Sequence, residues 1–550
     1  MKQLRKFFNF WNVVRIVAFA TLAITLVYPF VTMLKESFVS QDTGGFTLAN
    51  YFEFFKYPYY YKTLLNSMSV VLAATFFSTL IGLPMAYITT RYNIWGKSII
   101  NIMIILSLLS PPFIGAYSWI LLLGRNGFIT NLFRNIGIEL PPIYGWTGIV
   151  LVFSLKFFPY VYLFVSGALK SMDSSIEEAA ENLGVSGFKK LMTITFPLIL
   201  PTITAGALMV FMTSLADFGT PMLIGEGYKV LPVLIYEEYM SEIGGNATIA
   251  SMLSVIIIIC AMAILFVQKF IIAKKSYMMS ALRPPKVIAL KGGKRFWATF
   301  VIFLVAGVAM VQQVVVVITS FIKTKGPIFT KGFSLDSYRM IINKLSTNIS
   351  NTFLYSTIAI IIMVIAGLLL SYLIVRRKSK VNGLLDILIM FPYVIPGAVL
   401  GISLLVAFND GPIVLSGTAT ILIIAYVIRK LPYTIRSSTA ILYQIDPSIE
   451  EASINLGVSP MKTFFKTTAR LMAPGVLSGA VLSWITTINE LSSSVILYTG
   501  RTGTISVAIY TEVVRASFGT AAALASILTV TTIISILVFN KISGGRGITM

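Results

Sequence analysis

Long apolar runs separated by short polar segments follow one another along the chain. Each run has about twenty residues or more, the length that a helix needs to cross the hydrocarbon core of a bilayer. Such lengths suit helices rather than the roughly ten-residue alternating strands of a membrane barrel. We therefore expect an all-α, polytopic membrane protein with about twelve transmembrane helices. The predicted spans are 10–34, 64–89, 98–122, 143–168, 199–222, 248–272, 296–322, 350–375, 384–407, 417–439, 473–498 and 519–541.

Composition agrees with this pattern. Of the 550 residues, 56% are hydrophobic and only 12% are charged, which nearly excludes a soluble globular protein. The net charge of +22 is therefore better explained by Lys and Arg in cytoplasmic loops than by a nucleic-acid surface. Residues 273–295 are basic and contain no acid, which predicts a cytoplasmic linker between two groups of six spans.

The first apolar run is longer than the apolar region of a signal peptide and follows a basic start. We interpret it as an uncleaved first span with a cytoplasmic N-terminus. The chain contains no His and a single Cys, Cys260. An imidazole base, a His or Cys-cluster metal site and an intrachain disulfide are therefore excluded, and an intramembrane enzyme is poorly supported.

The two groups of spans are copies of one another. In the early spans, matching residues are 285 positions apart, as in Gly82 and Gly367; later, they are 273 apart, as in Gly184 and Gly457. The offset changes between the third and fourth spans, where a length difference in a loop explains it. We expect a first half at 1–272 and a second at 296–550, related as parallel repeats because each has six spans.

A polar segment between the fourth and fifth spans occurs in both halves. It covers about 173–192 in the first half, here called the first loop, and about 446–465 in the second, here called the second loop. Asp173 and Asp446 are candidate N-caps of a short helix, and a glycine in each copy suits a left-handed helix end. We expect a helix, a sharp bend and a second helix on the cytoplasmic side.

These loops resemble the signature loop of bacterial binding-protein-dependent ABC transporter permeases, which reads Glu-Ala-Ala, three residues, Gly, nine residues, Ile-x-Leu-Pro. Phe196 replaces the usual Leu in the first copy, and the Ile, Leu and Pro positions are lost in the second. The fusion of both halves in one chain further resembles the ferric-iron permeases. The matching residues are Glu178, Ala179, Ala180 and Gly184 in the first loop and Glu451, Ala452 and Gly457 in the second.

The resemblance implies a type I importer permease in which each loop docks in a groove of an ATP-binding subunit. The two glutamates would pair with groups of that groove, the alanines would permit close approach, and the glycines would hold the bend. The chain contains no G-x-x-x-x-G-K-[ST] motif. ATP and Mg²⁺ would therefore be held by two partner ATPase subunits, with no cofactor in this chain and no nucleic-acid partner. An extracytoplasmic binding protein would deliver the solute, and the protein would lie in the bacterial inner membrane.

Charged residues lie inside four predicted spans. Lys156 matches Arg429, and Asp217 matches Glu490. Because a buried charge in lipid costs several kcal/mol, we expect the pairs Lys156–Asp217 and Arg429–Glu490. Two interpretations remain open: the pairs pin neighbouring helices, or they line the route of the solute.

The leading hypothesis is thus the membrane subunit of an ATP-driven importer, with ferric iron suggested by the family resemblance alone. Sugar phosphates, phosphonates and thiamine are alternatives within the same class. A gradient-driven secondary transporter is the alternative of another class, although such a carrier does not need the duplicated loop.

Overall fold

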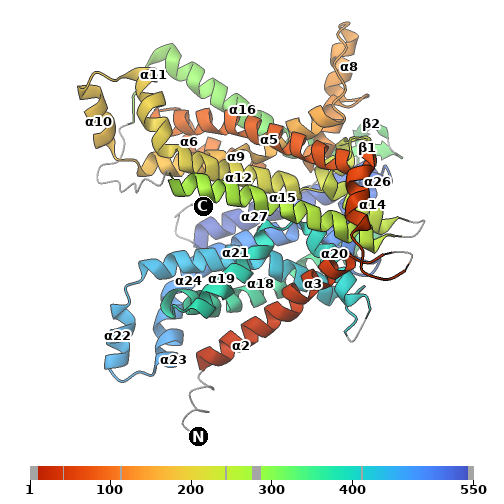
Figure 1. Cartoon of the computed structure of the whole chain (residues 1–550). Helices are drawn as coiled ribbons and strands as arrows, with labels where there is room; N and C mark the ends of the chain where they lie inside the picture. The colour runs from red at the N-terminus through yellow and green to blue at the C-terminus, as the bar shows by residue number, and fades with distance from the viewer. Residues whose placement is uncertain are drawn as a thin grey trace. The chain divides into compact units, whose positions relative to one another are not determined.

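The computed structural model describes residues 10–40, 43–108, 110–111, 114–241, 245–274, 287–326, 328–410 and 413–542. This part of the chain is almost entirely helical (Figure 1). Its few strand residues form one antiparallel hairpin, β1 (Ile322–Lys325) and β2 (Ile328–Phe333). The all-α prediction is confirmed. Residues 275–286 of the predicted basic linker lie outside the described residues.

The helices fall into two compact units, each described separately. The first unit comprises the described residues of Met1–Phe52, Ile235–Val255 and Ser320–Thr549. Its helices before the hairpin are α2 (Phe10–Leu22), η1 (Ala23–Val27), α3 (Tyr28–Glu36) and the first half of α4 (Ala49–Lys56), which continues into the second unit. After the hairpin come α17 (Asp336–Met340), η3 (Ile341–Leu345), α18 (Ser346–Arg376), α19 (Lys380–Val394), α20 (Gly397–Phe408), α21 (Ala419–Gln444), α22 (Ser448–Asn455), α23 (Pro460–Thr463), η4 (Phe464–Thr468), α24 (Ala469–Ile488), α25 (Ser494–Leu497), α26 (Ile505–Val514) and α27 (Phe518–Ile542).

The second unit comprises Glu53–Leu234 and the described residues of Ile256–Thr319. Its helices are α5 (Pro58–Arg91), α6 (Lys97–Leu108), α7 (Ile114–Leu123), α8 (Phe128–Asn135), α9 (Trp146–Ser171), α10 (Ser174–Asn182), α11 (Gly187–Lys190), η2 (Leu191–Thr195), α12 (Phe196–Ala216), α13 (Gly219–Ile224) and α16 (Gly292–Ser320). Two further helices, α14 (Leu231–Met240) and α15 (Ala247–Lys274), contribute residues to both units.

The compact units do not coincide with the two halves of the sequence repeat, because the first span of each half belongs to the other unit. Trp11 of α2 is buried in the first unit, where its ring stacks on Tyr372 at 4.4 Å and packs edge-on against Phe464. In the second unit, Ile302 and Ala306 of α16 join the core built by α5, α9 and α12. Each unit therefore contains the first span of the other sequence half, because that span carries the apolar side chains which complete its core.

Membrane-spanning helices make up most of both units. Among the described residues, nine helices are long and apolar enough to span a bilayer. A tenth candidate is the pair α19 and α20, which meet at 110° beside Pro396. Of the twelve predicted spans, the third corresponds to the two short helices α6 and α7, and the tenth to α21, which carries several charged residues. The chain is therefore a multi-pass membrane protein.

Matched glycines allow the central helices to approach closely. A Cβ added at Gly82 of α5 would lie 2.8 Å from the backbone oxygen of Phe158 in α9. A Cβ added at Gly367 of α18 would lie 2.6 Å from the methyl of Thr434 in α21. These are closer than carbon atoms pack, so both copies need glycine at this crossing. The crossing fixes the helices from which the loops and the buried charges project.

Candidate functional site

The first loop contains the predicted helix, bend and second helix. Asp173 caps α10 by accepting a hydrogen bond from the Ser175 N–H at 2.9 Å. The helix ends at Gly184, whose φ of 79° is in the left-handed region. The Val185 N–H then bonds back to the Ala180 carbonyl at 2.9 Å, as in a Schellman helix end. In Figure 1, α10 and α11 extend beyond the ends of α9 and α12.

The second loop repeats this construction. Asp446 accepts a hydrogen bond from the Ser448 N–H at 2.8 Å, and this bond lowers the pKa of the Asp446 carboxyl below its ordinary value. Gly457 has a φ of 85°, and α22 and α23 extend beyond the ends of α21 and α24 (Figure 1). A Cβ on either glycine would meet no atom within 4 Å, so the backbone conformation, not space, requires glycine.

Both loops expose large apolar side chains at matching positions. Leu183 is 83% exposed and its counterpart Leu456 is 85% exposed. Three further matched pairs are exposed: Ile176 and Ile449, Phe188 and Met461, and Met192 and Phe465. An apolar cluster at the polar end of a membrane protein, present in two copies, is typical of a protein-binding surface.

The predicted signature residues do not all lie on that surface. Glu451, Ala179 and Ala452 are exposed, and Glu178 is partly exposed. Ala180, by contrast, is buried. Ala180 therefore does not contribute to the exposed surface of the loop, and its expected role in the close approach of a partner stays a prediction.

A buried Arg–Glu pair anchors each loop to its own unit. Arg91, at the end of α5, contacts Glu177 of α10 at 2.7 Å, and Glu177 also accepts a hydrogen bond from Thr195 at 3.0 Å. In the second copy, Arg376 at the end of α18 contacts Glu450 of α22 at 3.0 Å.

The second anchor has additional hydrogen bonds. Tyr372 donates to Glu450 at 2.9 Å, and Arg376 donates to the Ile445 carbonyl at 2.6 Å. Arg91 and Arg376 are 285 positions apart and are therefore matched residues of the two copies, but sequence reasoning missed the glutamates that they bind. The available signal was that Glu177 and Glu450 are themselves a matched pair, directly before the signature glutamates.

The predicted pair of the first copy lies within the second unit. Lys156 of α9 contacts Asp217 at 3.0 Å, and both side chains are about nine-tenths buried. Asp217 follows the last residue of α12, and its other carboxylate oxygen accepts the Thr220 N–H at 2.8 Å. One carboxylate thus binds the cation of the fourth span and caps α13 after the break in the fifth.

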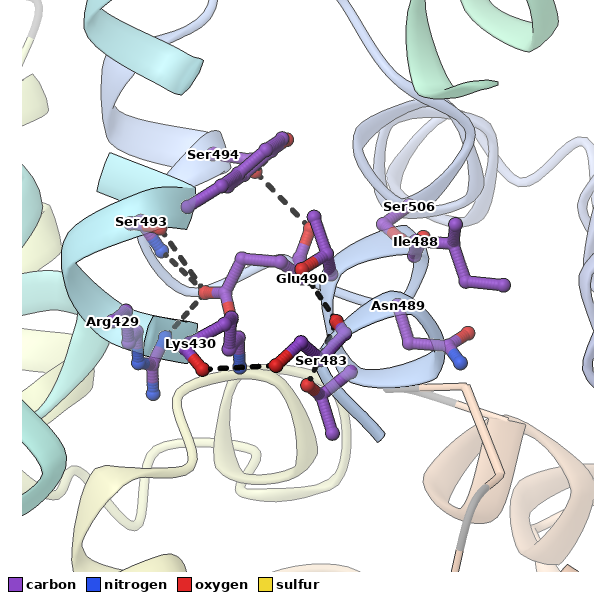
Figure 2. Close-up of polar contacts among 12 residues, drawn as sticks. Arg429, Lys430, Ser483, Ile488, Asn489, Glu490, Ser493, Ser494 and Ser506 are labelled. Carbon is purple, nitrogen blue, oxygen red and sulfur yellow. Dashed lines mark hydrogen bonds and ion pairs between the residues drawn. The ribbon is translucent and has the colours of Figure 1, made fainter. Parts of the chain in front are cut away.

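The predicted pair of the second copy is part of a triad. Figure 2 shows Arg429 and Lys430 of α21 beside the carboxylate of Glu490, with Ser493 also next to it. Lys430 contacts the second carboxylate oxygen at 2.8 Å, and the Ser493 N–H donates to the first at 3.2 Å. Sequence reasoning missed Lys430, because the matching residue of the first copy is Phe157.

The two buried sites differ in charge. Lys156 and Asp217 neutralise each other, whereas Arg429 and Lys430 share the single carboxylate of Glu490. The triad therefore has one positive charge in excess. In a medium of low dielectric constant, such an excess attracts anions strongly.

Comparison with known proteins agrees with the repeat. The family described as "Binding-protein-dependent transport system inner membrane component" matches the chain twice, at residues 78–276 and 363–544. The two matches begin 285 positions apart, which is the offset of the early spans.

Two longer relatives align with most of the chain. The chain is 31% identical to the "Ferric transport system permease protein FbpB" of Actinobacillus pleuropneumoniae over 536 residues, 94% of this chain and 76% of that protein. It is also 31% identical over 492 residues to a putative ferric transport system permease of Haemophilus influenzae, covering 87% of this chain and 76% of that protein.

A shorter relative matches only part of the chain. The molybdenum transport system permease protein ModB of Haemophilus influenzae is 31% identical over 205 residues, 35% of this chain and 88% of that protein. The repeated family match and the long alignments lead to one conclusion: the chain belongs to the binding-protein-dependent transport system inner membrane components, as a permease in which two copies are fused.

Proposed function

We propose that this permease imports ferric iron, driven by two ATP-binding-cassette subunits that dock on the first and second loops. The observation that carries the docking is the exposed apolar cluster that each loop presents at matching positions, with Leu183 and Leu456 at its tips. Exposure of one leucine is ordinary, but four matched pairs favour a surface that a partner covers.

The anchors support transmission of force through the loops. ATP-driven approach of the two ATPase subunits would pull on α10 and α22. Because Arg91 and Arg376 tie these helices to the ends of α5 and α18, movement of a loop would also move the long helices of its unit. Glu178 and Glu451, next to the anchoring glutamates, would contact basic or polar groups of the ATPase groove.

Orientation follows from the positive-inside rule. Arg91, Lys97, Arg376, Arg377 and Lys378 lie at helix ends close in sequence to the anchors. Lys and Arg concentrate in cytoplasmic loops. We infer that both loops face the cytoplasm, that the N-terminus lies on the same side, and that the protein resides in the bacterial inner membrane.

The cargo is inferred from the relatives. Two of them are ferric transport permeases by name, and their alignments cover most of this chain. Ferric iron is a hard ion that prefers oxygen ligands. An extracytoplasmic binding protein would select it, and the permease would pass it on by alternating access.

Docking is tested by co-purification. The chain is expressed with its ATPase subunit and purified as Glu178→Arg/Glu451→Arg and as the matched control Arg339→Glu, which changes an exposed residue of α17. We expect the ATPase to be retained by the wild type and the control and lost from the double variant. Retention by the double variant at the wild-type ratio would contradict docking through these residues.

The cargo needs a separate experiment. Proteoliposomes that contain the permease, the ATPase and the binding protein are supplied with radioactive iron, molybdate or a sugar phosphate on the outside. We expect ATP-dependent uptake of iron alone. Uptake of molybdate or the phosphate, without iron, would overturn the cargo but leave the docking proposal intact.

A further inference from the structure

Helix α21 is unusual among the long helices of the first unit. Every 18-residue stretch within it contains Arg429, Lys430 and Arg436, so it does not stand out as an apolar span. Its counterpart in the first copy, α9, is apolar enough to be one of the nine candidate spans among the described residues. Nevertheless, α21 packs between α18 and α24, and its residues Ile435, Ser438 and Leu442 are buried.

One face of α21 is open. Arg436, Ala440 and Tyr443 are exposed, and Arg429 and Tyr433 are partly exposed. These five positions are three or four residues apart, so they lie along one side of the helix. We call these five residues the open face of α21. It runs from the triad to the end of the helix that leads into the second loop.

Side chains of α19 lie beside the open face. Asp386 contacts Arg436 at 3.4 Å, and the rings of Tyr393 and Tyr433 lie 5.5 Å apart, edge to face. The Sδ atom of Met390 accepts a hydrogen bond from Arg436 Nε at 3.1 Å. The open face is therefore lined by polar and aromatic groups from two helices.

Such a face does not suit contact with lipid. The side chain of Arg436 is 55% exposed, and exposure of arginine to lipid costs several kcal/mol. Snorkelling to the membrane surface could relieve Arg436, but Arg429 lies seven residues further along, a rise of about 10 Å. A water-filled route explains both arginines.

The open face and the triad are positively charged together. Three cations, Arg429, Lys430 and Arg436, face two carboxylates, Glu490 and Asp386, which leaves one net positive charge. The first copy lacks this pattern, since Leu163 replaces Arg436 and Asn101 replaces Asp386. The excess charge is thus a property of one copy, not of the repeat.

Because Arg429 and Lys430 share the carboxylate of Glu490, Arg429 can leave it without leaving the carboxylate unpaired. Lys430 is buried and contacts Glu490 independently of Arg429. If Arg429 turned toward an incoming anion, Glu490 would remain neutralised by Lys430. Arginine suits this role because its planar fork binds carboxylate or phosphate oxygens with two hydrogen bonds.

We propose that the open face of α21 is an anion-binding part of the solute route, in which Arg429 and Arg436 contact anionic oxygen ligands of the cargo. Resting on the proposed ferric transport, this inference means that iron passes as a complex with anionic ligands. A bare trivalent cation would be repelled by the excess positive charge.

Cysteine accessibility tests the proposal. In a Cys260→Ser background, Tyr433→Cys and Ala440→Cys are placed on the open face, and Ile435→Cys serves as the buried control. Membrane vesicles with the loops outward are treated with a methanethiosulfonate reagent bearing either a sulfonate or a trimethylammonium group. The rate of labelling by the sulfonate reagent is divided by that of the trimethylammonium reagent. This ratio is normalised to the same ratio for free cysteine, which removes the intrinsic difference in reactivity of the two reagents.

We expect both open-face cysteines to react and the control to remain unlabelled. The normalised ratio should favour the sulfonate. One charge at about 10 Å in water is worth roughly 0.4 kcal/mol, about twofold in rate and opposite in sign for the two reagents, so Arg429→Gln or Arg436→Gln should each lower the ratio by about fourfold. Ferric nitrilotriacetate, an anionic chelate, should slow the labelling.

Three results would overturn the proposal. Absence of labelling at both open-face positions would mean that the face is not in water. A normalised ratio that favours the cationic reagent would remove the anion preference. A ratio unchanged by both arginine substitutions would mean that these residues do not cause it. Because no ATPase is present, failure here is separate from failure of docking or of the iron assignment.

Discussion

The two copies of the repeat agree in how they are anchored and differ in how they are charged. Both hold a loop by a buried Arg–Glu pair, and both place a buried carboxylate at the break in a long helix. Only the second copy adds Lys430 beside that carboxylate, and the pair Arg436–Asp386 further along α21. Under the proposed function, the features kept in both copies are those on which two ATPase subunits would dock. The features of one copy are those where, as we propose, the solute, which has no such symmetry, makes contact.

The largest effect should separate the two buried carboxylates. Glu490→Leu leaves two cations, Arg429 and Lys430, without their carboxylate, whereas Asp217→Leu leaves only Lys156. Breaking a buried pair typically costs about 3–5 kcal/mol of unfolding free energy. We expect Glu490→Leu to cost more than Asp217→Leu, as measured by denaturant unfolding of the purified chain in mixed micelles. Glu490→Gln, which keeps the shape of the side chain but not its charge, is the isosteric control. Equal costs for Glu490→Leu and Asp217→Leu would remove the distinction between the copies.

Substitutions in the loop anchors should cost less stability than loss of a buried carboxylate, and the two copies should respond alike. Glu450→Gln weakens bonds from Arg376 and Tyr372, and Glu177→Gln weakens those from Arg91 and Thr195. A buried charged hydrogen bond lost in this way costs about 1–3 kcal/mol. We expect both variants to keep ATP hydrolysis while solute uptake falls, because the loop no longer moves its long helix.

A charge swap sharpens the anchor prediction. Arg376→Glu combined with Glu450→Arg should recover part of the uptake that either single change abolishes. If the swap behaves like the sum of the single variants, the pair does not act as an anchor.

Making the copies alike should have a modest effect on stability. Lys430→Phe installs the residue of the first copy and leaves Glu490 paired with Arg429. Removal of one buried ion is costly when its partner is left unpaired, but here Glu490 keeps Arg429, so we expect a change below about 1.5 kcal/mol in unfolding free energy. Uptake should nevertheless be lost. Arg429 would be the only partner of Glu490 and could not turn toward the solute without leaving this carboxylate unpaired. Normal uptake by this variant would contradict a replaceable Arg429.

The smallest effect concerns pH and the second loop. The pKa of Asp446 is lowered by the hydrogen bond from the Ser448 N–H. A lowered pKa means that the cap stabilises α22 above the unfolded pKa of about 3.9 and is lost as the pH falls through the folded value. The protection of the amides at the start of α22, relative to their intrinsic exchange rates, should therefore fall below about pH 4. Asp446→Asn should abolish this loss of protection; an unchanged pH profile of the protection would contradict the assignment.

Much of the fold followed from the sequence because the membrane imposes simple rules. Long apolar runs gave most spans, and two fixed offsets gave the repeat. Asp173, Gly184 and their counterparts predicted the loops, since capping and left-handed helix ends depend on local residues. The pairs Lys156–Asp217 and Arg429–Glu490 followed from the cost of an isolated charge in lipid.

Features that depend on packing could not be predicted in this way. The exchange of first helices depends on which core Trp11 and Ile302 complete, and an apolar run does not reveal its neighbours. Burial of Ala180 depends on how α10 packs against the rest of its loop. Lys430 went unnoticed because comparison of the copies draws attention to what they share, and Phe157 occupies its place.

Cross-linking of the loop tips tests the central claim most directly. Leu183→Cys and Leu456→Cys, each in a Cys260→Ser background, are expressed with the ATPase subunit and treated with a short thiol-to-amine cross-linker. We expect each variant to form one adduct with an ATPase subunit, while the exposed cysteine of Phe333→Cys, in β2, forms none. Adducts absent from both loops, in an assembly that still hydrolyses ATP and takes up iron, would contradict the claim that these loops hold the ATPase.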